Sequence, residues 1–141
     1  MKVWFNLFCA DPQAQMVFYA GLLGWPEAVA SRSSIYRAVE QDGVQIGFNA
    51  QPAYALLGLA DRQPTALPAP VTAYATFMLE TSAAVDAAAA FASRHGGRVV
   101  RSPYATYYGQ WQTVLADPEG HVFRASCAAL PAGAVRAAAP P

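Results

Sequence analysis

The chain has 141 residues, of which 55% are hydrophobic and 13% are charged, and nine Lys and Arg balance nine Asp and Glu. This length fits one domain with a buried core. The zero net charge argues against binding to nucleic acid or to an anionic membrane, and no stretch of about 18 apolar residues predicts a transmembrane helix.

The cysteine content and the N-terminus favour a location in the cytoplasm. The chain holds two cysteines, Cys9 and Cys127. Two cysteines without Cys-x-x-Cys spacing do not predict a disulfide framework, so we expect buried thiols in a reducing cytoplasm. The N-terminus lacks the long apolar stretch and small-residue cleavage site of a signal peptide, and we interpret it as a first strand.

The first half of the chain predicts a strand, a helix and three more strands. Residues 3–9 are rich in β-branched and aromatic side chains, which favours a strand. Asp11 and Pro12 are typical of a helix start, and Gly24 is typical of a helix end, so we expect a helix of about 11–13 residues between them. Hairpin and apolar patterns predict the three following strands at 34–40, 44–49 and 53–59.

The second half repeats this order. Residues 61–70 hold three prolines and predict a linker. A strand at 71–79 precedes a helix that Thr81 or Ser82 can cap, and Gly96 and Gly97 end that helix. Residues 102–109 are expected to form a loop. The remaining strands are predicted at 98–101, 110–115 and 121–126, with a turn at 117–120 between the last two.

This repeat predicts a degenerate duplication of a β-α-β-β-β unit. We expect a single domain over residues 1–128, with module one at 1–60, the linker at 61–70 and module two at 71–128. The small residues and prolines of 129–141 predict a disordered tail.

Three motifs carry a resemblance to a known family. Asp11, followed by Phe18-Tyr19 and by Leu22-Leu23-Gly24-Trp25, resembles the first-helix signature of the vicinal-oxygen-chelate superfamily. Leu115–Ser126 is similar to its last-hairpin signature, and Gly96–Val99 is similar to its second helix exit. The resemblance covers about residues 3–127. It implies an α+β fold in which two βαβββ modules form a glyoxalase-like curled mixed sheet around a cleft, often within a homodimer.

The same resemblance allows a test for a metal site. Glyoxalase I, extradiol dioxygenases, fosfomycin-resistance transferases and epimerases of this superfamily use a metal held by His, Glu or Gln, whereas bleomycin-type resistance proteins bind their drug without one. The ligand positions carry over to Trp4, Gln45, Tyr74 and Arg124. A Trp offers only an N–H donor and an Arg cannot be deprotonated, so we expect no metal and no cofactor.

The two histidines do not change this expectation. His95 lies at the end of the second helix and is expected to be solvated. His121 has the opposite strand parity to Arg124, so we expect it to face away from the cleft and to form local hydrogen bonds.

Strand alternation predicts an aromatic-lined cleft with a few polar groups and one cation. Such a lining suits a planar or aromatic ligand whose anionic or carbonyl group is held by Arg124. Two alternatives stay open: Trp4, Phe8 and Met78 fill the cleft, or Arg124 only pairs with an acid such as Glu40. The predicted ligand-binding residues are Trp4, Asn6, Phe8, Gln45, Asn49, Tyr74, Thr76, Tyr104, Trp111 and Arg124.

We therefore expect a glyoxalase/bleomycin-resistance-like protein that binds a small aromatic or amphiphilic molecule without a metal. The residues reveal no nucleophilic set, and whether the protein is an enzyme stays open. One alternative is a metal-dependent lyase, isomerase or dioxygenase of the same superfamily with a shifted site. Another is a protein without a ligand whose surface binds a partner. The expected partners are a small molecule and, by resemblance, a second copy in a homodimer.

Overall fold

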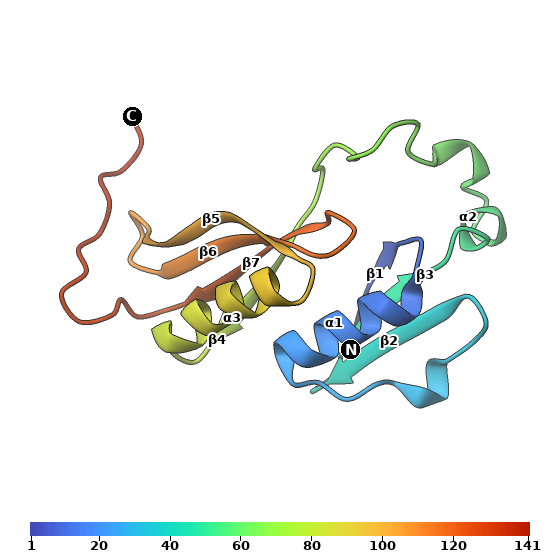
Figure 1. Ribbon diagram of the computed structural model, residues 1–141, viewed down its shortest axis with the longest axis horizontal. Coiled ribbons are helices and arrows are strands. Elements are labelled where there is room, and N and C mark those ends of the chain that lie inside the picture. Colours follow the sequence, from blue (N-terminus) through green and yellow to red (C-terminus); the bar gives the residue numbers. More distant parts are fainter. The chain divides into compact units, whose positions relative to one another are not determined.

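The computed structural model describes all 141 residues, and the chain divides into two compact units, Met1–Ala69 and Pro70–Pro141. Each unit consists of a mixed β-sheet with one long helix packed on one face (Figure 1). The predicted α+β class with two modules is therefore confirmed. None of the helices has the length and apolar character needed to span a membrane.

The first unit has a three-stranded sheet in the order β1-β3-β2. β1 runs parallel to β3, and β2 runs antiparallel to β3. The helix α1 packs on β2 and β3, where the ring of Tyr19 stacks on that of Phe48 at 5.2 Å between centroids. The elements are β1 (Val3–Phe8), α1 (Pro12–Leu23), a 3₁₀ turn η1 (Val29–Ser31), β2 (Tyr36–Gln41) and β3 (Val44–Asn49).

Local chemistry sets the ends of α1. The carboxylate of Asp11 accepts a hydrogen bond from the backbone N–H of Ala14 at 2.9 Å, and Pro12 occupies the first helical position. Gly24 ends the helix in a left-handed conformation, with a φ of 69°. The start and end predicted from the sequence are therefore both confirmed.

The strand predicted at 53–59 is wrong, because this segment forms a short helix, α2 (Ala53–Leu56). Its alanines and leucines are good helix formers, Pro52 stands at its start, and Gly58 follows it with a φ of 71°. A 3₁₀ turn η2 (Ala60–Arg62) comes next. The sheet of the first unit therefore has three strands, and an isolated bridge joins Glu27, which precedes β2, to Val39 on β2.

The second unit has the predicted β-α-β-β-β order and a four-stranded sheet in the order β4-β7-β6-β5. β4 is parallel to β7, and the other pairs are antiparallel. β5 extends into the region expected to be a loop, with two register shifts on the way. The elements are β4 (Ala75–Leu79), α3 (Ser82–Arg94), β5 (Arg98–Ala105), β6 (Trp111–Ala116) and β7 (Val122–Cys127).

The core of the second unit lies between α3 and the sheet. Leu115 and Phe123 are fully buried on the sheet, and Val85 and Ala92 are fully buried on the helix. Thr81 caps α3 by accepting a hydrogen bond from the backbone N–H of Ala84 at 3.1 Å. After β7 the chain contains no further helix or strand, and the predicted disorder of the tail stays a prediction.

Candidate functional site

The sheet of the second unit has one face covered by α3 and one face turned away from it. Residues that pair across neighbouring strands point to the same side, so Thr76 shares a side with Arg124, and Gln112 shares a side with Ser126. The buried Phe123 and Ala125 alternate with these positions and face the helix. We name this uncovered side the open face of the second unit; its residues are Tyr74, Thr76, Met78, Arg101, Tyr104, Tyr108, Gln112, Val114, Arg124 and Ser126.

Two cations, Arg101 and Arg124, lie on this open face, and three neighbours fix the guanidinium of Arg124. Its Nε–H donates to Thr76 Oγ1 at 2.9 Å, and Nη1 donates to the hydroxyl of Tyr108 at 3.3 Å. The guanidinium also lies over the ring of Tyr74, 5.0 Å from the centroid, which is cation–π distance. No carboxylate of its own unit forms an ion pair with it.

The side chain of Gln112, which is 2% exposed, joins the polar groups of the open face. Its Oε1 accepts hydrogen bonds from the hydroxyls of Tyr108 at 2.7 Å and Ser126 at 3.1 Å. Its Nε2 donates to the hydroxyl oxygen of Tyr104 at 2.5 Å. Sequence reasoning did not select Gln112 and Ser126, although strand alternation from Arg124 and Val114 places them on this side.

The directions of these hydrogen bonds decide what the face presents outward. Tyr108 accepts from Arg124 and donates to Gln112, and Gln112 donates to Tyr104. A hydroxyl carries one proton, so Tyr104 keeps its own proton for another acceptor. The second terminal nitrogen of Arg124 likewise bonds no protein acceptor. The open face therefore presents hydrogen-bond donors beside aromatic rings.

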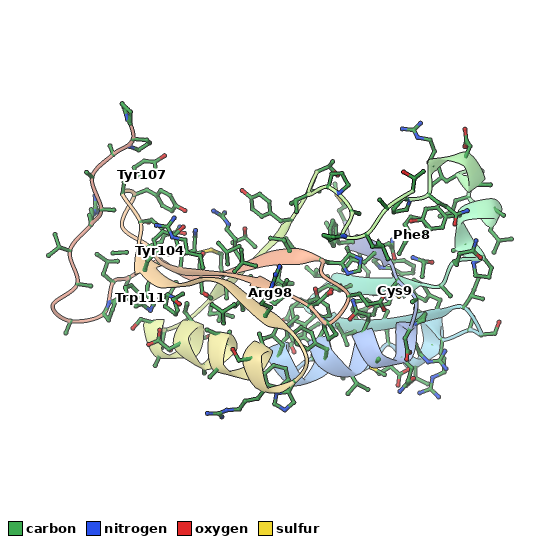
Figure 2. All side chains as sticks on the ribbon, turned by 45° about the horizontal axis from the view of Figure 1, so that its top comes forward. Phe8, Cys9, Arg98, Tyr104, Tyr107 and Trp111 are labelled. Atoms are coloured by element: carbon green, nitrogen blue, oxygen red, sulfur yellow. The ribbon has the colours of Figure 1, made fainter.

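Trp111, which was predicted to line the cleft, lies on the other side of this sheet. It pairs with Cys127 and stands one residue from Gln112, so it faces α3, where its indole N–H donates to Asp86 at 2.8 Å. Figure 2 shows Trp111 toward α3 and Tyr107 on the opposite side of the hairpin. This placement separates Trp111 from Arg124 and Tyr104.

Met78 and Tyr74 are 55% and 53% exposed, so neither fills the core of its unit. Tyr74 precedes β4 and reaches the guanidinium of Arg124 through its ring. Of the predicted residues in this unit, the structure thus brings together Tyr74, Thr76, Tyr104 and Arg124.

The first unit also has a sheet face turned away from its helix, and the other predicted residues lie there. Trp4 pairs with Gln45, Asn6 with Gly47, and Phe8 with Asn49, so these positions share one side, as alternation predicted. Trp4 is 55% exposed, whereas Gln45 is 1% exposed. This side is the open face of the first unit, and it also holds Tyr36, Ala38 and Glu40.

A hydrogen-bond network fills the centre of this first face. Nε2 of Gln45 donates to Glu40 at 2.5 Å and to Ser31 at 3.3 Å, and its Oε1 lies 2.9 Å from the hydroxyl of Tyr36. Glu40 also forms an ion pair with Lys2 at 3.6 Å. Glu40 is the acid that was considered as a partner of Arg124, and here its partners are Lys2 and Gln45. The amide of Gln45 is thus already bonded within the unit.

The hydroxyl of Tyr36 stands between two amides. It lies 3.0 Å from Asn6 Oδ1 and 2.9 Å from Gln45 Oε1, yet it has one proton to donate. Because Glu40 fixes the orientation of Gln45, we assign the Asn6 amide with its NH₂ group toward Tyr36. Burial, and then the charge of Glu40, raise the pKa of Tyr36, which keeps the phenol protonated as a donor. Sequence reasoning did not select Tyr36.

One end of the first open face is covered by α2. The ring of Tyr54 on α2 stacks on that of Phe8 with centroids 3.7 Å apart and an interplanar angle of 13°. Burial raises the pKa of Tyr54. Phe8, predicted to contact a ligand, therefore has an aromatic partner within its own unit, and Asn49 beside it is half-buried.

The residues at the carried-over metal positions do not fit a divalent cation. Trp4 and Arg124 offer donors only, and the amide oxygen of Gln45 is engaged by Tyr36. No three His, Cys, Asp or Glu side chains gather into a group that could hold an ion. His121 instead bonds the buried Asp117 at 2.9 Å in the turn before β7, and His95 bonds the carbonyl of Phe91 at the end of α3.

Comparison with known proteins identifies the family. The Glyoxalase-like domain family matches residues 2–126. A glyoxalase/bleomycin resistance protein/dioxygenase family enzyme from Burkholderia phytofirmans has 35% identity and a TM-score of 0.83, over 89% of this chain and 96% of that chain. A glyoxalase-related enzyme from Fulvimarina pelagi has 19% identity and a TM-score of 0.73, over 90% and 87% of the two chains.

A comparison with curated protein sequences gives no match. The family match spans most of the chain, and it agrees with the βαβββ order of the second unit. The chain therefore belongs to the glyoxalase-like domain family, within the vicinal-oxygen-chelate superfamily.

Proposed function

We propose that the protein binds a small aromatic or amphiphilic molecule without a metal, and that the open face of the second unit holds its anionic or carbonyl group. The binding residues in this proposal are Arg124 and Tyr104 as donors, with the ring of Tyr74 as an aromatic surface. Fold alone does not choose this function, because one fold hosts many activities, so the proposal depends on the chemistry of this face.

The observation that carries the proposal is the direction of the hydrogen bonds. Thr76 and Tyr108 accept hydrogen bonds from Arg124, and Tyr108 donates to Gln112. These bonds hold the guanidinium of Arg124 in place. The second terminal nitrogen of Arg124 has donors only, and the hydroxyl of Tyr104 keeps its proton to donate. Donors held in advance next to an unpaired guanidinium favour an oxyanion, because a charge-assisted hydrogen bond is roughly twice as strong as a neutral one.

A thermal-shift panel of two-ring aromatic carboxylates, such as naphthalene-2-carboxylate, and their neutral amides tests the proposal. We expect carboxylates to raise the melting temperature more than the matched amides do. The variant Arg124→Gln should abolish that difference, and Arg94→Gln, which changes a cation at the end of α3, serves as the matched control. If no aromatic compound stabilises the protein, or if Arg124→Gln responds like wild type, the proposed function is wrong.

Elemental analysis separates this proposal from a metal-dependent enzyme. The strand register leaves Trp4, Gln45 and Arg124 at the positions that alternation predicted, which does not supply a shifted ligand set. We expect substoichiometric Ni, Zn, Mn and Fe in the purified protein. One equivalent of any of these metals, removed by chelation together with ligand binding, would favour the enzyme instead.

A further inference from the structure

A cavity lies within the second unit, between the β5–β6 hairpin and the C-terminal tail. Its volume is about 280 Å³, near the lower end for ligand pockets, and this size suits a single-ring compound. Figure 1 shows the tail running past the end of this hairpin. The cavity is lined by Arg101, Tyr104, Thr106, Tyr107, Tyr108, Ala137, Ala138 and Pro140.

The C-terminal tail contacts the hairpin at Gly109, in the turn between β5 and β6; we call this contact the seat of the tail. Gly109 has a φ of 87°, and a Cβ built on it would lie 2.8 Å from both Nε and Nη2 of Arg136. The positive φ of Gly109 favours glycine, and the missing side chain leaves space for the guanidinium of Arg136. The turn itself is closed by Thr106, whose hydroxyl accepts from the backbone N–H of Gln110 at 2.9 Å. This seat places the small residues 137–140 as an apolar wall opposite the tyrosines.

The chemistry of the cavity combines a cation with aromatic faces. The guanidinium of Arg101 stacks 3.4 Å above the ring centroid of Tyr104. A stacked guanidinium uses its flat face, and its N–H edges bond no acceptor of the protein, so they stay available to a ligand. Tyr107 and Tyr108 meet edge to face at 5.0 Å. No carboxylate is among the lining residues.

We propose that this hairpin–tail pocket is a second ligand site, which binds single-ring aromatic carboxylates. The ring of the ligand lies among Tyr107, Tyr108 and the tail, and the N–H edges of Arg101 bind its carboxylate. The site differs from the one at Arg124 in its cation, Arg101, although the two sites share Tyr104 and Tyr108.

Benzoate and benzamide serve as probes, with the full chain observed by NMR. Benzoate should shift the backbone signals of Ala137 and Ala138 saturably in wild type and in Arg124→Gln. The variant Arg101→Gln should weaken this binding at least tenfold, and benzamide should bind wild type at least tenfold more weakly than benzoate. Arg136→Ala, which releases the seat of the tail, should also weaken it.

The outcomes separate the two sites. Loss of benzoate binding in Arg101→Gln but not in Arg124→Gln supports the hairpin–tail pocket, whatever happens to the proposal for Arg124. Shifts that are absent from the tail signals, or that persist unchanged in Arg101→Gln, overturn the second site. Circular dichroism of each variant checks the fold. Removal of residues 131–141, which touches no strand, should weaken benzoate binding as read from the signals of Tyr107 and Tyr108, and unchanged binding would overturn the second site.

Discussion

Replacing Gly47 by alanine should destabilise the first unit. A Cβ built on Gly47 would lie 2.5 Å from Cζ of Tyr36 and closer still to its hydroxyl oxygen and to Asn6 Oδ1. Gly47 itself is buried between β1 and β2. The new methyl group must therefore push the phenol of Tyr36 away from Gln45, because the backbone on either side is fixed by the sheet.

The magnitude follows from three contributions. Overpacking of a buried site costs about 1–3 kcal/mol, and the loss of the Tyr36–Gln45 hydrogen bond adds about 1 kcal/mol. Replacing a strand glycine by alanine returns about 0.5–1 kcal/mol. The net loss is about 1–3.5 kcal/mol, which lowers a urea midpoint by about 0.5–1.8 M when the denaturant slope is about 2 kcal/mol/M.

A double-mutant cycle with Tyr36→Phe shows whether the clash is the cause. Removing the hydroxyl removes the nearest atom, although the ring carbon still has to move. Gly47→Ala combined with Tyr36→Phe should be less destabilised than the sum of the single variants by about 1 kcal/mol. Urea unfolding followed by circular dichroism measures all four proteins. Additive effects, or a neutral Gly47→Ala, would refute this reasoning.

Three further predictions concern single interactions. The hydrogen bond from Arg32 lowers the pKa of Glu27 below 4.5, so the stability it contributes is present above about pH 4.5 and is lost as the pH falls through the lowered value. In Glu27→Gln the free energy of unfolding, measured in urea, should therefore depend less on pH between pH 3 and 6 than in wild type. An unchanged pH dependence would contradict this. Trp111→Phe, which removes the bond to Asp86, should cost about 0.5–1.5 kcal/mol in thermal unfolding, whereas no loss would show the bond to be neutral. Asp11→Ala should cost about 1 kcal/mol through its cap, with Asp11→Asn near wild type as control, and equal losses in both would rule out capping as the cause.

The elements that were predictable are those set by local chemistry. The capping of α1 depends on Asp11, Pro12 and Gly24, which act over a few residues of the chain. The side of the sheet on which Arg124 lies depends only on strand alternation and on which neighbours are apolar. Both could be derived without knowledge of the tertiary structure, and both are confirmed.

The errors have equally physical causes. An apolar run such as 53–59 does not distinguish a buried strand from a short helix, and here Pro52 and the alanines favoured the helix. Trp111 was predicted to bind the ligand together with nearby tyrosines, but its pairing with Cys127 turns it toward α3. Gln112 and Tyr36 act through side-chain bonds across neighbouring hairpin strands, and these bonds depend on the pairing register of the strands.

The location in the cytoplasm, the homodimer and the shared cleft of the two modules stay predictions. Apart from Trp111, which faces α3, the residues predicted to bind a ligand divide between the open faces of the two units. The proposed ligand chemistry therefore depends on the second open face alone, where Arg124 is held without an acidic partner.

The central claim is that this guanidinium recognises an oxyanion without help from a metal. Calorimetric titration of naphthalene-2-carboxylate into the full chain, with EDTA present throughout, tests it most directly. We expect saturable binding that weakens by about 10- to 100-fold in Arg124→Gln, the loss expected for one charge-assisted hydrogen-bonded contact. Binding that disappears with EDTA, or that is as tight in Arg124→Gln as in wild type, would contradict it.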